Sequence, residues 1–265
     1  MISLKIFHIN SFSSEDFKGN PAGVIPLDFW ISDTLMQGIA NQNGLSETAF
    51  FVKTSKGFRI RWFTPEVEVP LCGHATLASG FVLTELMGHP EDRILFESNS
   101  GDLEFVKDNG LFYLDFPAFK PVEAGFDFPF EKALGLKPVS TYQANEDIMA
   151  VFRSEEEIRS LQPDFAALKR LKARGLIVTA PGREVDFVSR FFAPGLGINE
   201  DPVTGSAYTK LFPYWAGQLN KTSFESLQLS ARGGRVVGEY RGDRVLIGGD
   251  AMAYLQGEIF IRNQQ

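Results

Sequence analysis

The stretch Leu71-Cys72-Gly73-His74-Ala75-Thr76 opens the part of the sequence that decides the fold. From His74 to Met87 the apolar residues recur with helical spacing and cover nearly every side of the expected helix. A helix that is apolar all round belongs in the interior of a protein. We therefore expect a fold built around a buried helix that begins near Gly73.

A second segment repeats this order further along the chain. A strand-like pattern over 185–192 leads to Glu200-Asp201-Pro202-Val203-Thr204-Gly205-Ser206-Ala207, and a largely apolar helical pattern follows. Two similar halves, each with a strand, a glycine turn and a buried helix, indicate a duplicated α+β domain with a cleft between the copies. Prolines cluster over 117–121, so we expect an N-terminal half over 1–118 and a C-terminal half over 119–254.

Composition excludes several classes of partner. The 265 residues include 26 Lys and Arg against 33 Asp and Glu, and the formal net charge is -7. Because the basic residues are also scattered, we expect no nucleic-acid partner and no membrane partner. The longest apolar stretch, 71–83, is too short to span a bilayer, and the first residues lack a signal-peptide hydrophobic region. We therefore expect a cytoplasmic protein.

The sequence also implies no metal and no organic cofactor. Cys72 is the single cysteine, which excludes an internal disulfide framework, and the three histidines have no zinc-type spacing with it. Neither a dinucleotide-binding glycine pattern nor a P-loop occurs.

Gly73 and Gly205 each stand at the expected start of a buried helix. The unpaired N–H groups and the positive dipole end of such a helix form an anion site. If the two halves face each other, two such sites converge, and a small molecule that carries a carboxylate is the natural ligand. The alternative is that each glycine only permits a tight strand-to-helix turn.

Glu47 has an unusual position in the pattern around it. Counting by two in the strand-like segment 45–52 places this carboxylate on the same face as Leu45, Ala49 and Phe51. Such a glutamate is either a salt-bridged structural group or a general base activated by burial.

Three more residues each allow two interpretations, and a fourth excludes one class of enzyme. His74 is either a neutral hydrogen-bonding group of a site or a helix cap, and Asp201 before Pro202 is also typical of an ordinary turn. Cys72 beside a helix start is either a reactive thiol or inert packing. Ser206 lacks the second glycine of a nucleophile elbow and has no His/Asp pattern, which excludes a serine hydrolase.

Five ordered motifs resemble the phenazine-biosynthesis PhzF-like family, and the match runs from about Ile6 to Ile259. The motifs are Gly19-Asn20-Pro21-Ala22-Gly23-Val24, Leu45-Ser46-Glu47-Thr48-Ala49-Phe50, Arg61-Trp62-Phe63-Thr64-Pro65-Glu66, Leu71-Cys72-Gly73-His74-Ala75-Thr76 and the segment 200–207 quoted above.

The resemblance implies a fold like that of diaminopimelate epimerase. Each half is then a mostly antiparallel, β-barrel-like sheet wrapped around a central helix, with the first half completed by the last strand, 255–265. It also implies a homodimer and a cofactor-independent isomerase that moves a proton on a small carboxylate-bearing substrate. In the phenazine enzyme that substrate is a dihydro-hydroxyanthranilate.

The resemblance also implies roles for individual residues. Glu47 matches the acid/base glutamate, while His74, Asp201 and Ser206 match residues that bind the substrate or help to protonate it. The backbone at Gly73 and Gly205 would hold the carboxylate.

Asn20, Cys72 and Thr204 are further candidates for the site. Related epimerases and proline racemases use one cysteine in each half. Here Cys72 stands at the first such position, but Thr204 occupies the second, so a two-thiol racemase is disfavoured. An epimerase or racemase that uses Cys72 with a non-thiol partner remains an alternative. A catalytically silent small-molecule binding protein is another.

Overall fold

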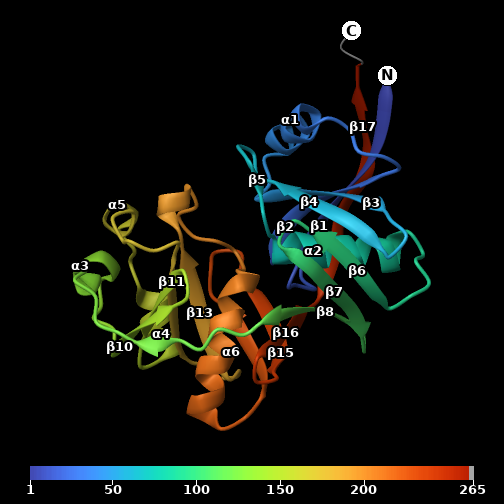
Figure 1. Ribbon diagram of the computed structural model, residues 1–265. Helices are drawn as coiled ribbons and strands as arrows, with labels where there is room; N and C mark the ends of the chain where they lie inside the picture. The colour runs from blue at the N-terminus through green and yellow to red at the C-terminus, as the bar shows by residue number, and fades with distance from the viewer. Residues whose placement is uncertain (263–265) are drawn as a thin grey trace. The chain divides into compact units, whose positions relative to one another are not determined.

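The computed structural model describes residues 1–262, and the chain divides into two compact units (Figure 1). The first unit is Met1–Asp115 together with the chain from Gly248 onward, and the second is Phe116–Ile247. These borders lie three residues before the expected 118/119 boundary and seven residues before the expected return at 255. Residues 263–265 of the expected returning segment lie outside the described residues.

Strand pairing explains why the chain returns to the first unit before residue 255. The last strand, β17 (Ala251–Ile261), pairs antiparallel with β1 (Ile2–Ser11) along its length, from Ser11 opposite Ala251 to Ile2 opposite Ile261. Strand pairing therefore ties residues before 255 to the first unit. Among the described residues, no helix has the length and apolar character needed to cross a membrane.

The first unit contains two helices, a π-helical turn and nine strands within the described residues. In chain order they are β1, β2 (Asn20–Leu27), α1 (Asp33–Asn43), β3 (Glu47–Lys53), β4 (Phe58–Phe63), β5 (Glu68–Val69), α2 (Gly73–Phe81), the π-helical turn η1 (Val82–Leu86), β6 (Arg93–Ser98), β7 (Gly101–Asp108), β8 (Leu111–Pro117) and β17.

The second unit has its own set of elements. They are β9 (Val122–Glu123), α3 (Phe130–Leu134), β10 (Ser140–Ala144), β11 (Asp147–Val151), α4 (Glu155–Ser160), α5 (Phe165–Leu168), β12 (Leu176–Pro181), β13 (Phe187–Phe192), the 3₁₀ turn η2 (Pro194–Leu196), α6 (Gly205–Leu219), β14 (Ser223–Gln228), β15 (Gly234–Tyr240) and β16 (Arg244–Gly249).

The same order of strand pairings occurs in both units. In the first, β1 and β2 pair antiparallel, β2 and β3 parallel, β3 and β4 antiparallel, β4 and β6 parallel, and β6 and β7 antiparallel. In the second, β10 to β15 follow the same alternation, with parallel pairs at β11/β12 and β13/β14. The α+β class expected from the sequence is therefore confirmed.

Parallel neighbours need a crossover connection, and helices supply it at matching places. The helix α1 connects β2 to β3, and α4 and α5 connect β11 to β12. The connection from β4 to β6 contains α2, and the connection from β13 to β14 contains α6. The glycine-turn helices detected in the sequence are thus the equivalent crossovers of the two units.

The helix α2 is the central helix of the first unit. It contacts β1, β2, β3, β7 and β17, and every residue from His74 to Phe81 is buried. Gly80 allows the closest approach, because a Cβ atom built there would lie 2.2 Å from the ring of Phe105. The helix is apolar all round because strands surround it, as the pattern predicts.

The helix α6 is buried in a similar way in the second unit. The ring of Trp215 stacks on Phe187 of β13 at 5.4 Å, and its indole N–H donates to Thr179 of β12. Pro213 lies inside the helix and has no N–H for the carbonyl of Thr209. The backbone N–H of Phe119 donates to that carbonyl at 2.9 Å instead.

Local sequence also sets the turn between β7 and β8. The hairpin of β7 and β8 pairs Asp108 with Leu111, and Asn109 and Gly110 both have positive φ, at 50° and 78°. This is the backbone that a type I′ turn requires.

Candidate active site

Glu47 is the first residue of β3 and retains only 15% exposure of its side chain. The preceding helix α1 ends at Gly44, whose positive φ of 62° turns the chain toward this strand. Farther along β3, Ala49 and Phe51 on the same face are buried. The structure therefore places a largely buried carboxylate on an apolar strand face.

His74, the second residue of α2, lies directly against this carboxylate. Its Nε2 atom is 3.3 Å from Oε2 of Glu47, and its side chain is 8% exposed. Burial lowers the pKa of His74 to about 4, and a hydrogen bond to the Pro21 carbonyl opposes this shift only in part. The imidazole is therefore neutral at physiological pH, so its contact with Glu47 is not a conventional ion pair.

Cys72 completes a group of three at the start of α2. It occupies the N-cap position but its thiol caps no backbone N–H, and Sγ lies 3.5 Å from Nδ1 of His74. The imidazole thus contacts a thiol at one ring nitrogen and the Glu47 carboxylate at the other.

The three side chains are also types that bind metal ions. The ligand atoms of Glu47, Cys72 and His74 all lie within 4.8 Å of one another. However, the thiol contacts one ring nitrogen and the carboxylate contacts the other, whereas one metal ion binds only one nitrogen of an imidazole.

Neighbouring polar residues fix the backbone at this helix start. The hydroxyl of Ser11 donates to the His74 carbonyl at 2.8 Å, and that of Thr76 donates to the Cys72 carbonyl at 2.6 Å. Asn20 is fully buried on β2, directly opposite Ser11 in the register of β1 and β2. The predicted residues Asn20 and Gly73 therefore belong to the surroundings of His74, whereas the contributions of Ser11 and Thr76 were not predicted.

The second unit has a different polar group at the start of α6. Thr204 is the N-cap residue, and its hydroxyl donates to Oδ2 of Asp201. Gln228, buried on β14, accepts from the Thr204 N–H at 2.9 Å and donates to the Asp201 carbonyl at 2.9 Å. Three of the predicted residues, Asp201, Thr204 and Gly205, thus lie in one loop and helix start held by Gln228, which the sequence analysis missed.

Ser206 contacts two cations that the sequence analysis also missed. Its hydroxyl accepts a hydrogen bond from Nη2 of Arg174 at 3.0 Å, and its carbonyl accepts one from Nζ of Lys210 at 3.1 Å. Both cations pair with Asp147, which is completely buried. Burial disfavours the charge of Arg174, but the hydrogen bonds and charge of Asp147, together with the charges of Glu146 and Asp201, outweigh burial and raise the pKa of Arg174.

A signal for one of these residues is present in the sequence. Lys210 stands among apolar residues of the expected helix, just as Glu47 stands on an apolar strand face. The same argument that selected Glu47 would have selected Lys210. Arg174 and Asp147 carry no such local signal, because both lie in polar segments typical of loops.

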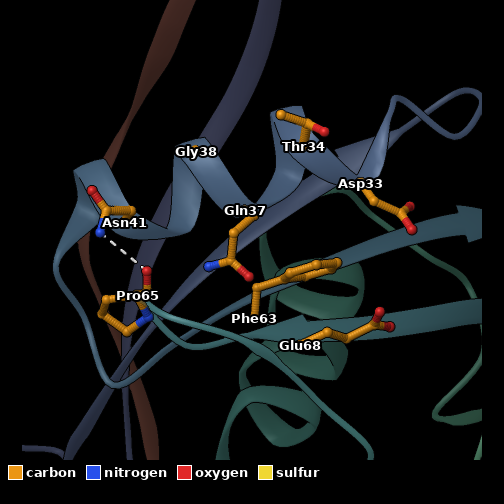
Figure 2. A pocket seen from close by; sticks show the side chains of 8 residues that line it. All are labelled: Asp33, Thr34, Gln37, Gly38, Asn41, Phe63, Pro65 and Glu68. Carbon is orange, nitrogen blue, oxygen red and sulfur yellow. Dashed lines mark hydrogen bonds between the residues drawn. The ribbon is translucent and has the colours of Figure 1, made fainter.

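A hollow of about 630 Å³ on the first unit contains none of the predicted site residues (Figure 2). It lies between α1 and the segment of β4 and β5, where Asp33 and Glu68 both pair with Arg61. The amide of Asn41 bonds to the Pro65 carbonyl at 3.0 Å. Its polar groups hold the helix to the strands, so we do not assign it chemistry.

Comparisons with known proteins agree with the motifs. A family model described as phenazine biosynthesis-like protein matches residues 9–257. An uncharacterized isomerase from Pseudomonas aeruginosa is 50% identical over 97% of this chain and 99% of that protein.

Solved structures show similarity to the same family. The crystal structure of a PhzF-family phenazine biosynthesis protein from Enterococcus faecalis has a TM-score of 0.96 and 45% identity, covering 98% of this chain and 100% of that chain. A hydroxyproline epimerase from Agrobacterium vitis, at 9% identity, has a TM-score of 0.63 over 97% of this chain and 92% of that chain, a likeness of fold alone. The chain therefore belongs to the phenazine biosynthesis-like PhzF family of isomerases.

Proposed function

We propose that the protein is a cofactor-independent isomerase that moves a proton on a small carboxylate-bearing metabolite, with Glu47 as the acid/base. The observation that carries the proposal is the 3.3 Å contact between Glu47 Oε2 and Nε2 of a buried imidazole. A carboxylate beside an ammonium or guanidinium group is a weak base, because the cation favours its charged form. Glu47 instead faces a ring that burial keeps neutral.

The chemistry follows from this environment. Glu47 removes a proton from a carbon atom next to an acidifying group and returns it at another position of the same molecule. One positioned acid/base of this kind typically contributes about 10²–10⁴-fold to the rate. His74 orients the carboxylate through its Nε2 side.

We assign binding of the substrate's acidic group to the two helix starts. The first N–H groups of a helix have no intrahelical acceptor, and the dipole favours an anion there. Gly73 and Gly205 are the first residues of α2 and α6, and Ser206 adds a hydroxyl to the second of these sites. Asp201 and Asn20 are proposed to bind polar groups of the substrate.

An epimerase or racemase that uses Cys72 is a second candidate function. It is favoured by the position of Sγ, 3.5 Å from Nδ1 of His74, since a neutral imidazole can accept the thiol proton. The second unit offers Thr204 rather than a second thiol, and its hydroxyl is engaged with Asp201. We therefore place this reaction after the one that uses Glu47.

The experiment is a labelling screen in D₂O. Wild type, Glu47→Gln, Cys72→Ser and a control variant, Glu68→Gln, are incubated with a small-metabolite extract, and mass spectrometry identifies compounds that gain deuterium. The control removes a carboxylate of the same unit that pairs with Arg61 at the surface. We expect labelling with wild type, Cys72→Ser and Glu68→Gln, and none with Glu47→Gln.

Other outcomes decide between the candidates. Labelling that survives in Glu47→Gln but is lost in Cys72→Ser would establish the Cys72 reaction. Tight binding of carboxylates by calorimetry, without deuterium gain by any compound, would indicate a silent binding protein.

A homodimer is also part of the proposal. It is expected from the resemblance, and light scattering on the purified protein tests it. A molar mass near that of one chain at micromolar concentration would contradict the dimer.

A further inference from the structure

The guanidinium group of Arg174 contacts a carboxylate, a hydroxyl and an aromatic ring at once. Nε donates to Oδ1 of Asp147 at 2.8 Å, and Nη2 donates both to the same carboxylate and to the hydroxyl of Ser206. The group also lies 5.2 Å from the ring centre of Phe191. A carboxylate and an aromatic face therefore fix the plane of the guanidinium and direct Nη2 toward Ser206.

Asp147 is a rigid anchor for this arrangement. Its side chain has no exposure, and it also pairs with Nζ of Lys210 at 3.2 Å. Lys210, whose side chain is 2% exposed, donates to the Ser206 carbonyl. Two cations held by one buried carboxylate thus contact Ser206 at its hydroxyl and at its backbone.

These contacts determine the direction of the Ser206 hydroxyl proton. Arginine is only a donor, so the bond from Nη2 occupies a lone pair of Ser206 Oγ and leaves the serine proton for another acceptor. Within residues 1–262 no acceptor for that proton is present. The hydroxyl at the start of α6 is therefore available to donate to an anionic ligand.

A second arginine of the same unit shows what a purely structural role looks like. Arg190 pairs with both oxygens of Glu200 and lies 5.0 Å from the Phe192 ring centre, as Arg174 lies on Phe191. Its remaining bonds go to the backbone carbonyls of Ile158 and Leu161. The contact with a hydroxyl at a helix start distinguishes Arg174 from this example.

We propose that Arg174 is a positioning residue that makes the Ser206 hydroxyl a hydrogen-bond donor for the acidic group of the substrate. This inference rests on the proposed function, in which that group binds at the start of α6. Hydrogen bonds to charged groups are strong enough that losing the oriented donor should weaken carboxylate binding about tenfold or more.

The test is a double-mutant cycle with benzoate as the probe. Benzoate is titrated into full-length wild type, Ser206→Ala, Arg174→Lys and the double variant, and the backbone amide signals of Gly205 and Ser206 are followed by NMR. Lysine keeps a positive charge for the buried Asp147, but its point charge does not reproduce the guanidinium fork that contacts both groups. We expect each single change to weaken benzoate binding about tenfold, and the double change to weaken it no further.

Arg190→Lys is the matched control. It alters the same kind of carboxylate pair and ring contact without touching Ser206. If Arg190→Lys weakens benzoate binding, the double variant with Ser206→Ala should therefore show the product of the two single fold-losses. If the fold-losses of Arg174→Lys and Ser206→Ala also multiply in their double variant, Arg174 has a merely structural role and the proposal is overturned.

Two further results separate this inference from the proposed function. Absence of benzoate-induced shifts at Gly205 and Ser206 in wild type would overturn the donor role. Coupled loss of benzoate binding, together with no deuterium gain by any metabolite, would support the role of Arg174 while the proposed reaction fails. With a labelled metabolite in hand, Arg174→Lys should raise KM and leave kcat near the wild-type value, because the bond holds substrate and transition state alike.

Discussion

The starts of α2 and α6 occupy equivalent places in the two units but differ in their electrostatics. At the start of α2, the carboxylate of Glu47 faces a thiol and an imidazole kept neutral by burial. At the start of α6, Ser206 is held by two cations and the buried carboxylate that pairs with both. The same strand pairings and crossovers thus support two different chemical environments.

The difference indicates a division of labour. A carboxylate beside neutral groups keeps its affinity for a proton, whereas oriented donors at a positively charged helix start stabilise a bound anion. Each unit supplies one helix start, and side chains within the helices and outside them distinguish the two.

Removing the base should have the largest effect. We expect Glu47→Gln to lower the rate of deuterium gain about 10²–10⁴-fold, against about tenfold for Ser206→Ala, because only the first removes the group that accepts the proton. Initial rates of labelling by mass spectrometry measure both. Equal losses from the two changes would mean that the helix starts do not have separate roles.

The buried charges of the second unit should dominate stability. Asp147→Asn removes the buried carboxylate that Lys210 and Arg174 share and leaves both cations only the partly exposed carboxylate of Glu146. It should lower the free energy of unfolding by about 3 kcal/mol. The control is Asp186→Asn, which removes the partly exposed partner of Lys221 and should cost no more than about 1 kcal/mol. Urea denaturation measures both, and similar values for the two variants would argue against a rigid anchor at Asp147.

The first unit should show its buried imidazole in the pH dependence of stability. Above pH 6.5 His74 is neutral in both folded and unfolded chains, so it adds no pH dependence. Between pH 6.5 and about 4 only the unfolded chain takes up the proton, which destabilises the folded state progressively, by roughly 3 kcal/mol in total.

The variant His74→Gln isolates this effect. Wild type should lose more unfolding free energy than the variant between pH 7.5 and pH 4.5, as measured by urea denaturation at each pH. Parallel losses in the two proteins would show that His74 is not kept neutral by the fold.

How much was predictable from the sequence depended on how local the signal was. The helix start at Gly73 was predicted because neighbouring residues set it, and the turn at Asn109-Gly110 and the capping of α4 by Ser154 are equally local. Glu47 could be selected because it places a carboxylate on a strand face where the alternating pattern otherwise places apolar residues.

The support of Ser206 was not predictable in this way. Arg174 and Asp147 lie 32 and 27 residues from their respective partners Ser206 and Arg174, and both follow polar residues that resemble exposed loops. Their burial results from strand pairing across the unit, which no local pattern encodes. Family motifs identified Ser206, but only the structure identified what holds it.

The two helices also differ in how closely their glycines are packed, and this gives the smallest predicted effects. In α2, a Cβ at Gly80 would lie 2.2 Å from the Phe105 ring, so Gly80→Ala should destabilise the protein by about 1–3 kcal/mol through overpacking. In α6, a Cβ at Gly217 meets nothing within 4 Å, so Gly217→Ala should stabilise it by about 0.5–1 kcal/mol through the better helix propensity of alanine. Thermal and urea unfolding of the two variants should therefore shift in opposite directions. A stabilising Gly80→Ala would mean that α2 is packed less tightly by its surrounding strands than this close approach indicates.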